Sequence, residues 1–207
     1  LPHIFAPDAA VAIRRRSWAA SAVAATALVA LLCVRAHAEI VHFYPLYNPA
    51  WDRMMTQVRQ KTPKDAIVTA WWSPGHFLTS MGERRVTIDG SSQDEPQAYW
   101  VADLFIQGSE RDALGVLRML DTSGNRSVEW LQSKGLSLAD SVDLLKTILP
   151  LSRTEARSKL LRRFSAAEAD DLVHLTHGAA SPPPAYLFLY NHMIEQALAL
   201  DFIGRWD

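Results

Sequence analysis

The pattern of hydrophobic and polar positions separates a long apolar segment near the amino terminus from a mixed sequence after it. Residues 17–34 form an uncharged run of 18 residues, which follows three arginines at positions 14–16 and ends at Arg35. As an α-helix this run would be about 27 Å long, close to the roughly 30 Å hydrocarbon core of a membrane. We therefore predict a transmembrane helix over residues 17–34.

A cleavable signal peptide is the alternative for this segment. The basic region and the apolar run are followed by Ala36-His37-Ala38, a pattern typical of a cleavage site. The length of the apolar run and a face of small residues favour a retained helix that packs against other membrane helices. The arginines place the amino side in the cytoplasm, so both alternatives export the rest of the chain. Because the chain opens with Leu1 and not Met, we also expect an upstream part to be missing.

Three short apolar runs farther along the chain predict β-strands. They cover residues 67–72, 85–88 and 185–190, and turn residues bound the first two. Helical patterns lie between the second and third runs, and such connections favour parallel pairing. We predict a helix-rich α/β fold with a small three-stranded sheet, mostly parallel or mixed, that is covered by helices and preceded by one transmembrane helix.

Helix start signals recur between the predicted strands. Asn48 and Pro49 predict a helix whose apolar face contains Trp51 and which docks beside the first strand. Farther on, four serines are each followed three residues later by an acidic residue, as in a capping box. The pairs are Ser109 with Asp112, Ser137 with Asp140, Ser152 with Glu155, and Ser165 with Glu168. These pairs predict four successive helices.

The elements divide the chain into four segments. We expect residues 1–16 in the cytoplasm and residues 17–34 in the membrane. Residues 35–64 form a membrane-proximal linker and helix, and residues 65–207 form an exported soluble α/β domain. Residues 39–207 carry 17 Lys and Arg against 21 Asp and Glu, a net charge of −4. This balance excludes nucleic acid as an expected partner.

The candidate chemistry lies in a strand-to-helix turn, Trp71-Trp72-Ser73-Pro74-Gly75-His76. Pro74 cannot continue a strand ladder, and ligands of open α/β sheets usually bind where a strand ends and the next helix begins. Adjacent residues of an extended chain point to opposite faces, so we expect one indole in the core and the other facing a cleft. The alternative is that both indoles lie in the core. Nearby, Asp89 either contacts a ligand or forms an Asx turn with its own backbone.

This turn, followed by Arg85-Val86-Thr87-Ile88-Asp89-Gly90, resembles the soluble-domain signature of the oligosaccharyltransferase catalytic-subunit family. The family hallmark is Trp-Trp-Asp-Tyr-Gly, and the resemblance runs from about Trp51 to Asp207. It implies the carboxyl-terminal part of a bacterial or archaeal membrane glycosyltransferase, with the last transmembrane helix and the soluble domain. The alternative function is a non-catalytic exported binding or scaffolding module anchored by one helix.

The resemblance implies that the enzyme moves a lipid-linked oligosaccharide to an acceptor protein or peptide. It places the chain in the inner membrane, with the soluble domain on the periplasmic or other extracytoplasmic side. It assigns acceptor binding to Trp71, Trp72, Ser73, Gly75 and His76. In the family, the two tryptophans and the aspartate hold the hydroxyl of the acceptor sequence Asn-X-Ser/Thr. Ser73 stands in the place of that aspartate, so a neutral hydroxyl replaces a charged hydrogen-bond acceptor.

The resemblance places the catalytic carboxylates and a divalent metal, Mg²⁺ or Mn²⁺, in loops between membrane helices that this chain lacks. The fragment alone is therefore not expected to be active, and no catalytic or metal-binding residue is assigned to it. A second soluble motif of the family, on a kinked helix, is not identified near residues 165–180. His174 and His177, with two aspartates upstream, have a spacing that can bind a metal. A solvated helix face is the alternative for these two histidines.

Overall fold

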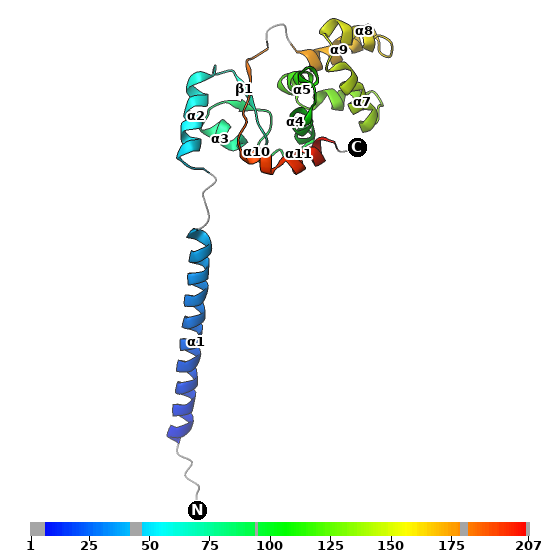
Figure 1. Ribbon diagram of the computed structural model, residues 1–207. Helices are drawn as coiled ribbons and strands as arrows, with labels where there is room; N and C mark the ends of the chain where they lie inside the picture. Colours follow the sequence, from blue (N-terminus) through cyan, green and yellow to red (C-terminus); the bar gives the residue numbers. More distant parts are fainter. Residues whose placement is uncertain (1–6, 42–46, 94, 179–181, 206–207) are drawn as a thin grey trace, which may run out of the picture. The chain divides into compact units, whose positions relative to one another are not determined.

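The computed structural model describes residues 7–41, 47–93, 95–178 and 182–205, with the side chains of residues 18–40 described in the first range. The chain forms two compact units, Leu1–Asn48 and Pro49–Asp207. Figure 1 shows the helices and strands of both units.

The first unit contains one long helix, α1 (Pro7–Val41). Its segment Trp18–Ile40 has 23 residues with a mean hydropathy of 1.9, and by length and composition it is apolar enough to cross a membrane. The predicted transmembrane run of residues 17–34 lies within α1. A signal sequence near an amino terminus has the same length and composition, so both alternatives for this segment stay open.

The second unit contains a sheet that, within the described residues, has three strands in the order β2-β1-β3. The strands are β1 (Ile67–Thr69), β2 (Arg85–Val86) and β3 (Ala185–Leu187), and both pairings are parallel. The predicted small sheet is thus confirmed, with parallel pairing throughout. Each strand is shorter than its apolar run, because the residues after it turn away from the ladder at the carboxyl edge of the sheet.

Helices make up most of the second unit. Helices α2 (Pro49–Lys61) and α3 (Gly75–Ser80) lie on one side of the sheet in Figure 1. The others are α4 (Pro96–Ile106), α5 (Glu110–Ser123), α6 (Arg126–Ser133), α7 (Leu138–Ile148), α8 (Arg153–Leu160), α9 (Ala166–His177), α10 (His192–Glu195) and α11 (Ala197–Gly204). Helix α5 packs against α4 and α9, and α11 lies along α4. The prediction of a helix-rich α/β fold is confirmed.

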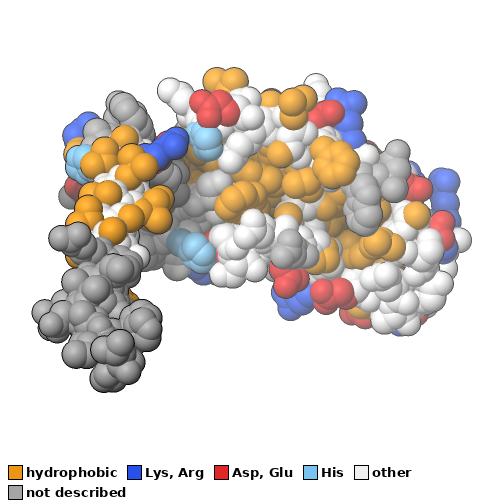
Figure 2. Space-filling view, turned by 90° about the horizontal axis from the view of Figure 1, so that it is seen from below, with side chains coloured by type: hydrophobic (Ala, Val, Ile, Leu, Met, Phe, Trp, Pro, Cys, Tyr) orange, Lys and Arg blue, Asp and Glu red, His pale blue; other side chains and the backbone are white. Residues whose placement is uncertain are grey.

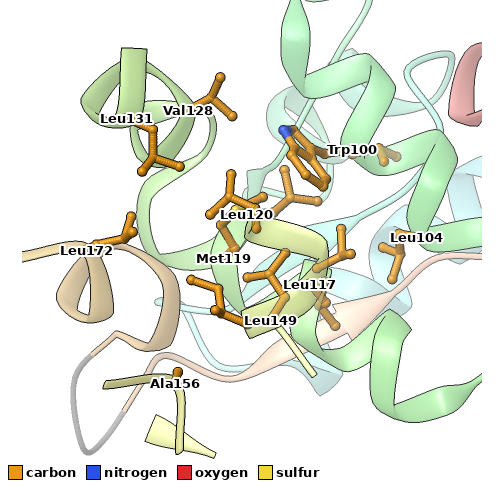
Figure 3. Close-up of a cluster of buried hydrophobic side chains, with 14 of the residues drawn as sticks. Trp100, Leu104, Leu117, Met119, Leu120, Val128, Leu131, Leu149, Ala156 and Leu172 are labelled. Atoms are coloured by element: carbon orange, nitrogen blue, oxygen red, sulfur yellow. The ribbon is translucent and has the colours of Figure 1, made fainter. Parts of the chain in front are cut away.

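The hydrophobic core lies between these helices and extends to the end of β1. Figure 3 shows part of this core, with Trp100 of α4, Met119 of α5 and Leu172 of α9 pointing into a common interior. Gly115 permits the close approach of α5 to the end of α7, because a Cβ at this position would lie 2.4 Å from the Leu149 carbonyl oxygen. The core therefore packs the helices against the residues that follow β1.

Serine caps begin all four of the predicted helices, but only two of the caps are complete capping boxes. At Ser152 and Ser165 the serine accepts a bond from the backbone of the third helical residue, and the glutamate there accepts one from the serine backbone. At Ser109 and Ser137 the serine bond is present without the reciprocal bond. We attribute this difference to the aspartate side chain, which is one methylene shorter than glutamate and does not reach back to the serine backbone.

Replacing Ser165 by alanine should lower the free energy of unfolding by about 1 kcal/mol, because the first turn of α9 loses its side-chain acceptor. Ser158 lies exposed inside α8, so Ser158→Ala serves as a matched control with a change within about 0.5 kcal/mol. Urea unfolding of the chain in detergent, followed by circular dichroism, measures both changes. Equal losses at the two positions would contradict the assigned role of the cap.

Candidate functional site

The candidate site is the turn of residues 71–76, which connects β1 to α3 at the carboxyl edge of the sheet. Pro74 is the N-cap of α3, and its carbonyl oxygen accepts a bond from the Leu78 N–H at 2.9 Å. The Gly75 N–H donates to the Trp72 carbonyl oxygen at 3.1 Å. These backbone bonds fix the path of the turn without using any of its side chains.

The two tryptophans have different environments. Trp71 is 1% exposed and belongs to the hydrophobic core. Trp72 is half-buried and packs against the core from outside, with its ring centroid 6.3 Å from that of Trp71. Trp71 therefore anchors the turn, while part of Trp72 remains open to solvent and to a ligand.

Gly75 brings the turn against a second turn at the end of β2. A Cβ on Gly75 would lie 2.5 Å from both Cα and Cβ of Asp89 and 2.6 Å from the Ile88 carbonyl oxygen. Two of these three contacts are to backbone atoms, which cannot move aside as a flexible side chain can. Glycine is thus the residue that this packing requires.

Asp89 connects the two turns through both of its carboxylate oxygens. Its Oδ1 accepts a bond from the Ser91 N–H at 2.8 Å, which is the Asx turn considered from the sequence. Its Oδ2 lies 3.5 Å from Nδ1 of His76, whose side chain is largely exposed. Asp89 thus holds His76 at the turn that follows β1, at the carboxyl edge of the sheet.

Ser73 presents its hydroxyl to the interior and not to solvent. Its Oγ is buried and has no hydrogen bond of ordinary geometry within the described residues. The Tyr190 side chain lies close to it: burial raises the pKa of Tyr190, and the neighbouring Ser73 hydroxyl opposes this shift. In this conformation Ser73 cannot contact a ligand directly.

Aromatic rings from three parts of the chain gather beside the turn. We call Trp51 of α2, Phe77 of α3, and Phe188 and Tyr190 from the segment after β3 the aromatic cluster. The Trp51 ring centroid lies 6.0 Å from Phe77, 5.8 Å from Phe188 and 5.5 Å from Tyr190. Trp51 lies here as expected, because the helix that contains it was predicted to dock beside the first strand. Phe188 and Tyr190 were not predicted from the sequence as members of the site.

The two histidines considered as metal ligands do not form a site. His174 is exposed, whereas His177 is buried. The two ring nitrogens of His177 lie 2.8 Å from Thr176 Oγ1 and 3.1 Å from the Leu151 carbonyl oxygen. Burial lowers the pKa of His177 to about 4, with a smaller contribution from Arg118. The metal hypothesis for this pair is therefore wrong, and so is the solvated-face alternative for His177.

Helices α10 and α11 carry an exposed apolar surface. Seen from below, the side on which these helices lie in Figure 1, hydrophobic side chains gather into a patch (Figure 2). Large exposed hydrophobic side chains of these helices include Ile194, Leu198 and Phe202, with exposed fractions of 74 to 86%. Contiguous apolar surfaces of this kind are typical of interaction surfaces.

Comparisons with known proteins point to one class of enzyme. The chain is 37% identical over 178 residues to a dolichyl-phosphooligosaccharide-protein glycotransferase of Methanococcus voltae, covering 82% of this chain and 19% of that protein. It is 31% identical over 169 residues to the protein of the same name from Methanocaldococcus jannaschii, covering 79% of this chain and 18% of that one. The chain thus spans about a fifth of the length of these relatives.

A more distant similarity extends to plants. Over 66 residues, the chain is 32% identical to a subunit of the dolichyl-diphosphooligosaccharide–protein glycosyltransferase of Arabidopsis thaliana, covering 32% of this chain and 9% of that protein. No model of a known protein family matches the chain, and no solved structure matches it.

Proposed function

Because the chain belongs to the oligosaccharyltransferase catalytic-subunit family, we propose that it is the carboxyl-terminal part of a membrane glycosyltransferase and positions the acceptor protein. The complete enzyme would transfer a glycan from a lipid-linked oligosaccharide to that acceptor. The names of the relatives support a protein acceptor and a dolichyl-linked donor. The chain spans about a fifth of these relatives, so the transfer itself belongs to the complete protein.

The divalent metal expected for the complete enzyme, Mg²⁺ or Mn²⁺, does not fit the residues described for this chain. Among these residues, no group of three or more His, Cys, Asp or Glu side chains could hold a metal ion. We therefore assign the metal and the catalytic carboxylates to other parts of the complete enzyme. No step of the proposed function of this chain involves the metal.

The proposed orientation follows from the charges around α1. Arginines 14–16 hold the amino side in the cytoplasm by the positive-inside rule, and residues 17–34 cross the inner membrane. Residues 35–64 would then form the membrane-proximal linker and helix. Residues 65–207 would form a domain on the periplasmic or other extracytoplasmic side, where the acceptor protein is met.

The acceptor site that we propose is the turn of residues 71–76, and the observation that carries it is the different burial of the two tryptophans. Trp71 is locked in the core, whereas half-buried Trp72 presents an aromatic surface at the carboxyl edge of a parallel sheet. Ligands of α/β sheets bind at this edge. The exposed His76 side chain extends the surface toward Asp89, buried Gly75 packs the turn against Asp89, and Ser73 lies behind the surface.

Replacing Trp72 by alanine should weaken binding of an Asn-X-Thr peptide at least tenfold without unfolding the chain, because the lost side chain is an accessible wall of the proposed site. Trp130 of α6 is also half-buried and packs against the core, so Trp130→Ala is a matched control that should leave peptide binding unchanged. Isothermal titration calorimetry and thermal unfolding of the full chain in detergent measure both properties. Unchanged binding in the Trp72 variant would overturn the proposed site.

A non-catalytic binding or scaffolding module is the second candidate function. It is favoured by Ser73, a neutral residue with a buried Oγ in the place of the family aspartate. Only the first function forms a glycosylated product. With a lipid-linked oligosaccharide and an Asn-X-Thr peptide, the complete enzyme should form a glycopeptide detectable by mass spectrometry. A binding module would bind the peptide without forming that product.

A further inference from the structure

The Tyr190 side chain lies at the proposed acceptor site because β3 runs parallel to β1. Thr69 of β1 is paired with Leu187 of β3, and the Phe188 N–H donates to the Thr69 carbonyl oxygen at 2.9 Å. After this bond, the segments that follow β1 and β3 both leave the sheet at the same edge. Tyr190 is thus brought beside Ser73, although 116 residues separate the two in the sequence.

The ring of Tyr190 is held by the aromatic cluster while its hydroxyl makes polar contacts. The ring meets Trp51 edge to face, with an interplanar angle of 62°, and its centroid lies 6.1 Å from that of Phe188. The hydroxyl donates to Oε1 of Gln196 at 3.4 Å, a long hydrogen bond. The apolar end of the side chain is therefore fixed, and its polar end is only weakly engaged.

The buried Ser73 hydroxyl is the second polar group at this position. It has no hydrogen bond of ordinary geometry within the described residues, and it lies close enough to Tyr190 to influence its pKa. A tyrosine hydroxyl has one proton to donate and two positions at which it can accept. With its proton directed to Gln196, the Tyr190 hydroxyl keeps two accepting positions. The buried Ser73 hydroxyl can donate to one of them, and the other remains for the hydroxyl of a bound serine or threonine.

We propose that Tyr190 is a specificity-determining residue that contacts the acceptor hydroxyl, and that Ser73 is a positioning residue that orients the Tyr190 hydroxyl. The proposal rests on the proposed function of the turn of residues 71–76 as the acceptor site. It explains how a chain with serine in place of the family aspartate can still distinguish a hydroxyl-bearing acceptor. The contact is made by the half-buried tyrosine, since Ser73 Oγ is itself buried.

The test compares two peptides, Asn-X-Thr and Asn-X-Val, which differ by replacement of the threonine hydroxyl with a methyl group of similar size. Their binding to the full chain in detergent is measured by calorimetry. The wild-type chain should prefer the threonine peptide. Tyr190→Phe should reduce this preference about 2- to 12-fold, the range of one neutral hydrogen bond, with binding of the valine peptide unchanged. Tyr186→Phe, which changes an exposed tyrosine of β3, is the matched control and should keep the wild-type ratio.

The role of Ser73 is tested in the same ratio. Ser73→Ala should reduce the preference for threonine, and the double variant Ser73→Ala/Tyr190→Phe should show no further loss beyond Tyr190→Phe alone. Such non-additivity is the result expected when one residue acts through the other. Independent, additive losses would overturn the positioning role of Ser73.

The outcomes separate this inference from the proposed function. If the wild-type chain binds neither peptide, or if Trp72→Ala does not weaken binding, the proposed acceptor site is wrong and this inference falls with it. If both peptides bind but threonine is not preferred, only the inference is overturned. The same holds if Tyr190→Phe keeps the preference or weakens both peptides equally, because tyrosine would then have a purely structural role.

Discussion

Replacing Trp71 by alanine is expected to lower the free energy of unfolding of the second unit by about 3 to 5 kcal/mol. The side chain is 1% exposed and belongs to the core, so its removal takes away buried apolar area and leaves a cavity. Because a domain is typically stable by only about 5 to 15 kcal/mol, this loss would consume much of the stability. Urea unfolding of the full chain in detergent, monitored by circular dichroism, measures the change.

The control for this prediction is the neighbouring tryptophan. Trp72→Ala should cost clearly less stability, because Trp72 is half-buried and part of its surface already faces solvent. Trp71→Phe should recover part of the lost stability, since it refills much of the cavity. Equal losses for Trp71→Ala and Trp72→Ala would show that both indoles belong to the core, and the turn would then lack the accessible ring that the proposed function requires.

The hydrophobic pattern predicted the strands of a small sheet, mostly parallel or mixed, but not where the strands end. The runs of residues 67–72 and 185–190 stay apolar beyond Thr69 and Leu187, the last residues of β1 and β3. Trp71 is buried without belonging to the ladder, and Phe188 is buried with a backbone bond to Thr69 beyond the last residue of β3. An apolar run indicates burial, and a buried irregular segment gives the same signal as a strand.

The turn of the candidate site could be predicted from the sequence because its signals are local. Proline and glycine follow the apolar run within a few residues. Tyr190 could not be assigned in the same way, since its position beside Ser73 depends on the register between β1 and β3. The signal that could have found it was the predicted parallel pairing itself, because parallel strands bring their carboxyl ends to one edge.

The histidine pair shows the limit of spacing arguments on a helix. His174 and His177 are three residues apart, which places two side chains near each other on a helix. Spacing alone does not say which part of the helix faces the protein. Helix α9 packs against α5 and α8, and this packing buries His177 while His174 stays exposed. The environment, not the spacing, decides against metal binding.

Asp121 on α5 is expected to give the second-largest effect, because it is a half-buried carboxylate with one oxygen buried and unpartnered within the described residues. Its Oδ1 is buried and has no hydrogen bond within the described residues. Burial raises the pKa of Asp121 from 3.8 to about 7, and the positive charge of Arg85 opposes this shift. The folded chain therefore keeps the proton of Asp121 at pH values at which the unfolded chain has lost it.

Because the folded state keeps this proton, Asp121 lowers the free energy of unfolding as the pH rises. Below pH 3.8 both states carry the proton, and Asp121 causes no loss of stability. Between pH 3.8 and about 7 the folded state binds more protons than the unfolded state, so the contribution of Asp121 to the free energy of unfolding falls as the pH rises. Above pH 7 the carboxylate is charged in both states, and the loss is complete.

Replacing Asp121 by asparagine should therefore stabilise the chain at pH 8 by about 2 to 4 kcal/mol and leave its stability at pH 4 nearly unchanged. Each pKa unit corresponds to about 1.4 kcal/mol, and Asp121 keeps some contact with solvent, which places the expected effect below the full difference. Urea unfolding of wild type and variant at a series of pH values between 4 and 8 measures the change. Comparing the two at each pH removes the contributions of the other titrating groups.

Asp143→Asn, at an exposed position of α7, should follow the wild-type profile. If Asp121→Asn also runs parallel to wild type across this range, Asp121 ionises normally in the folded chain, and the unpaired buried carboxylate is not a cost to the fold.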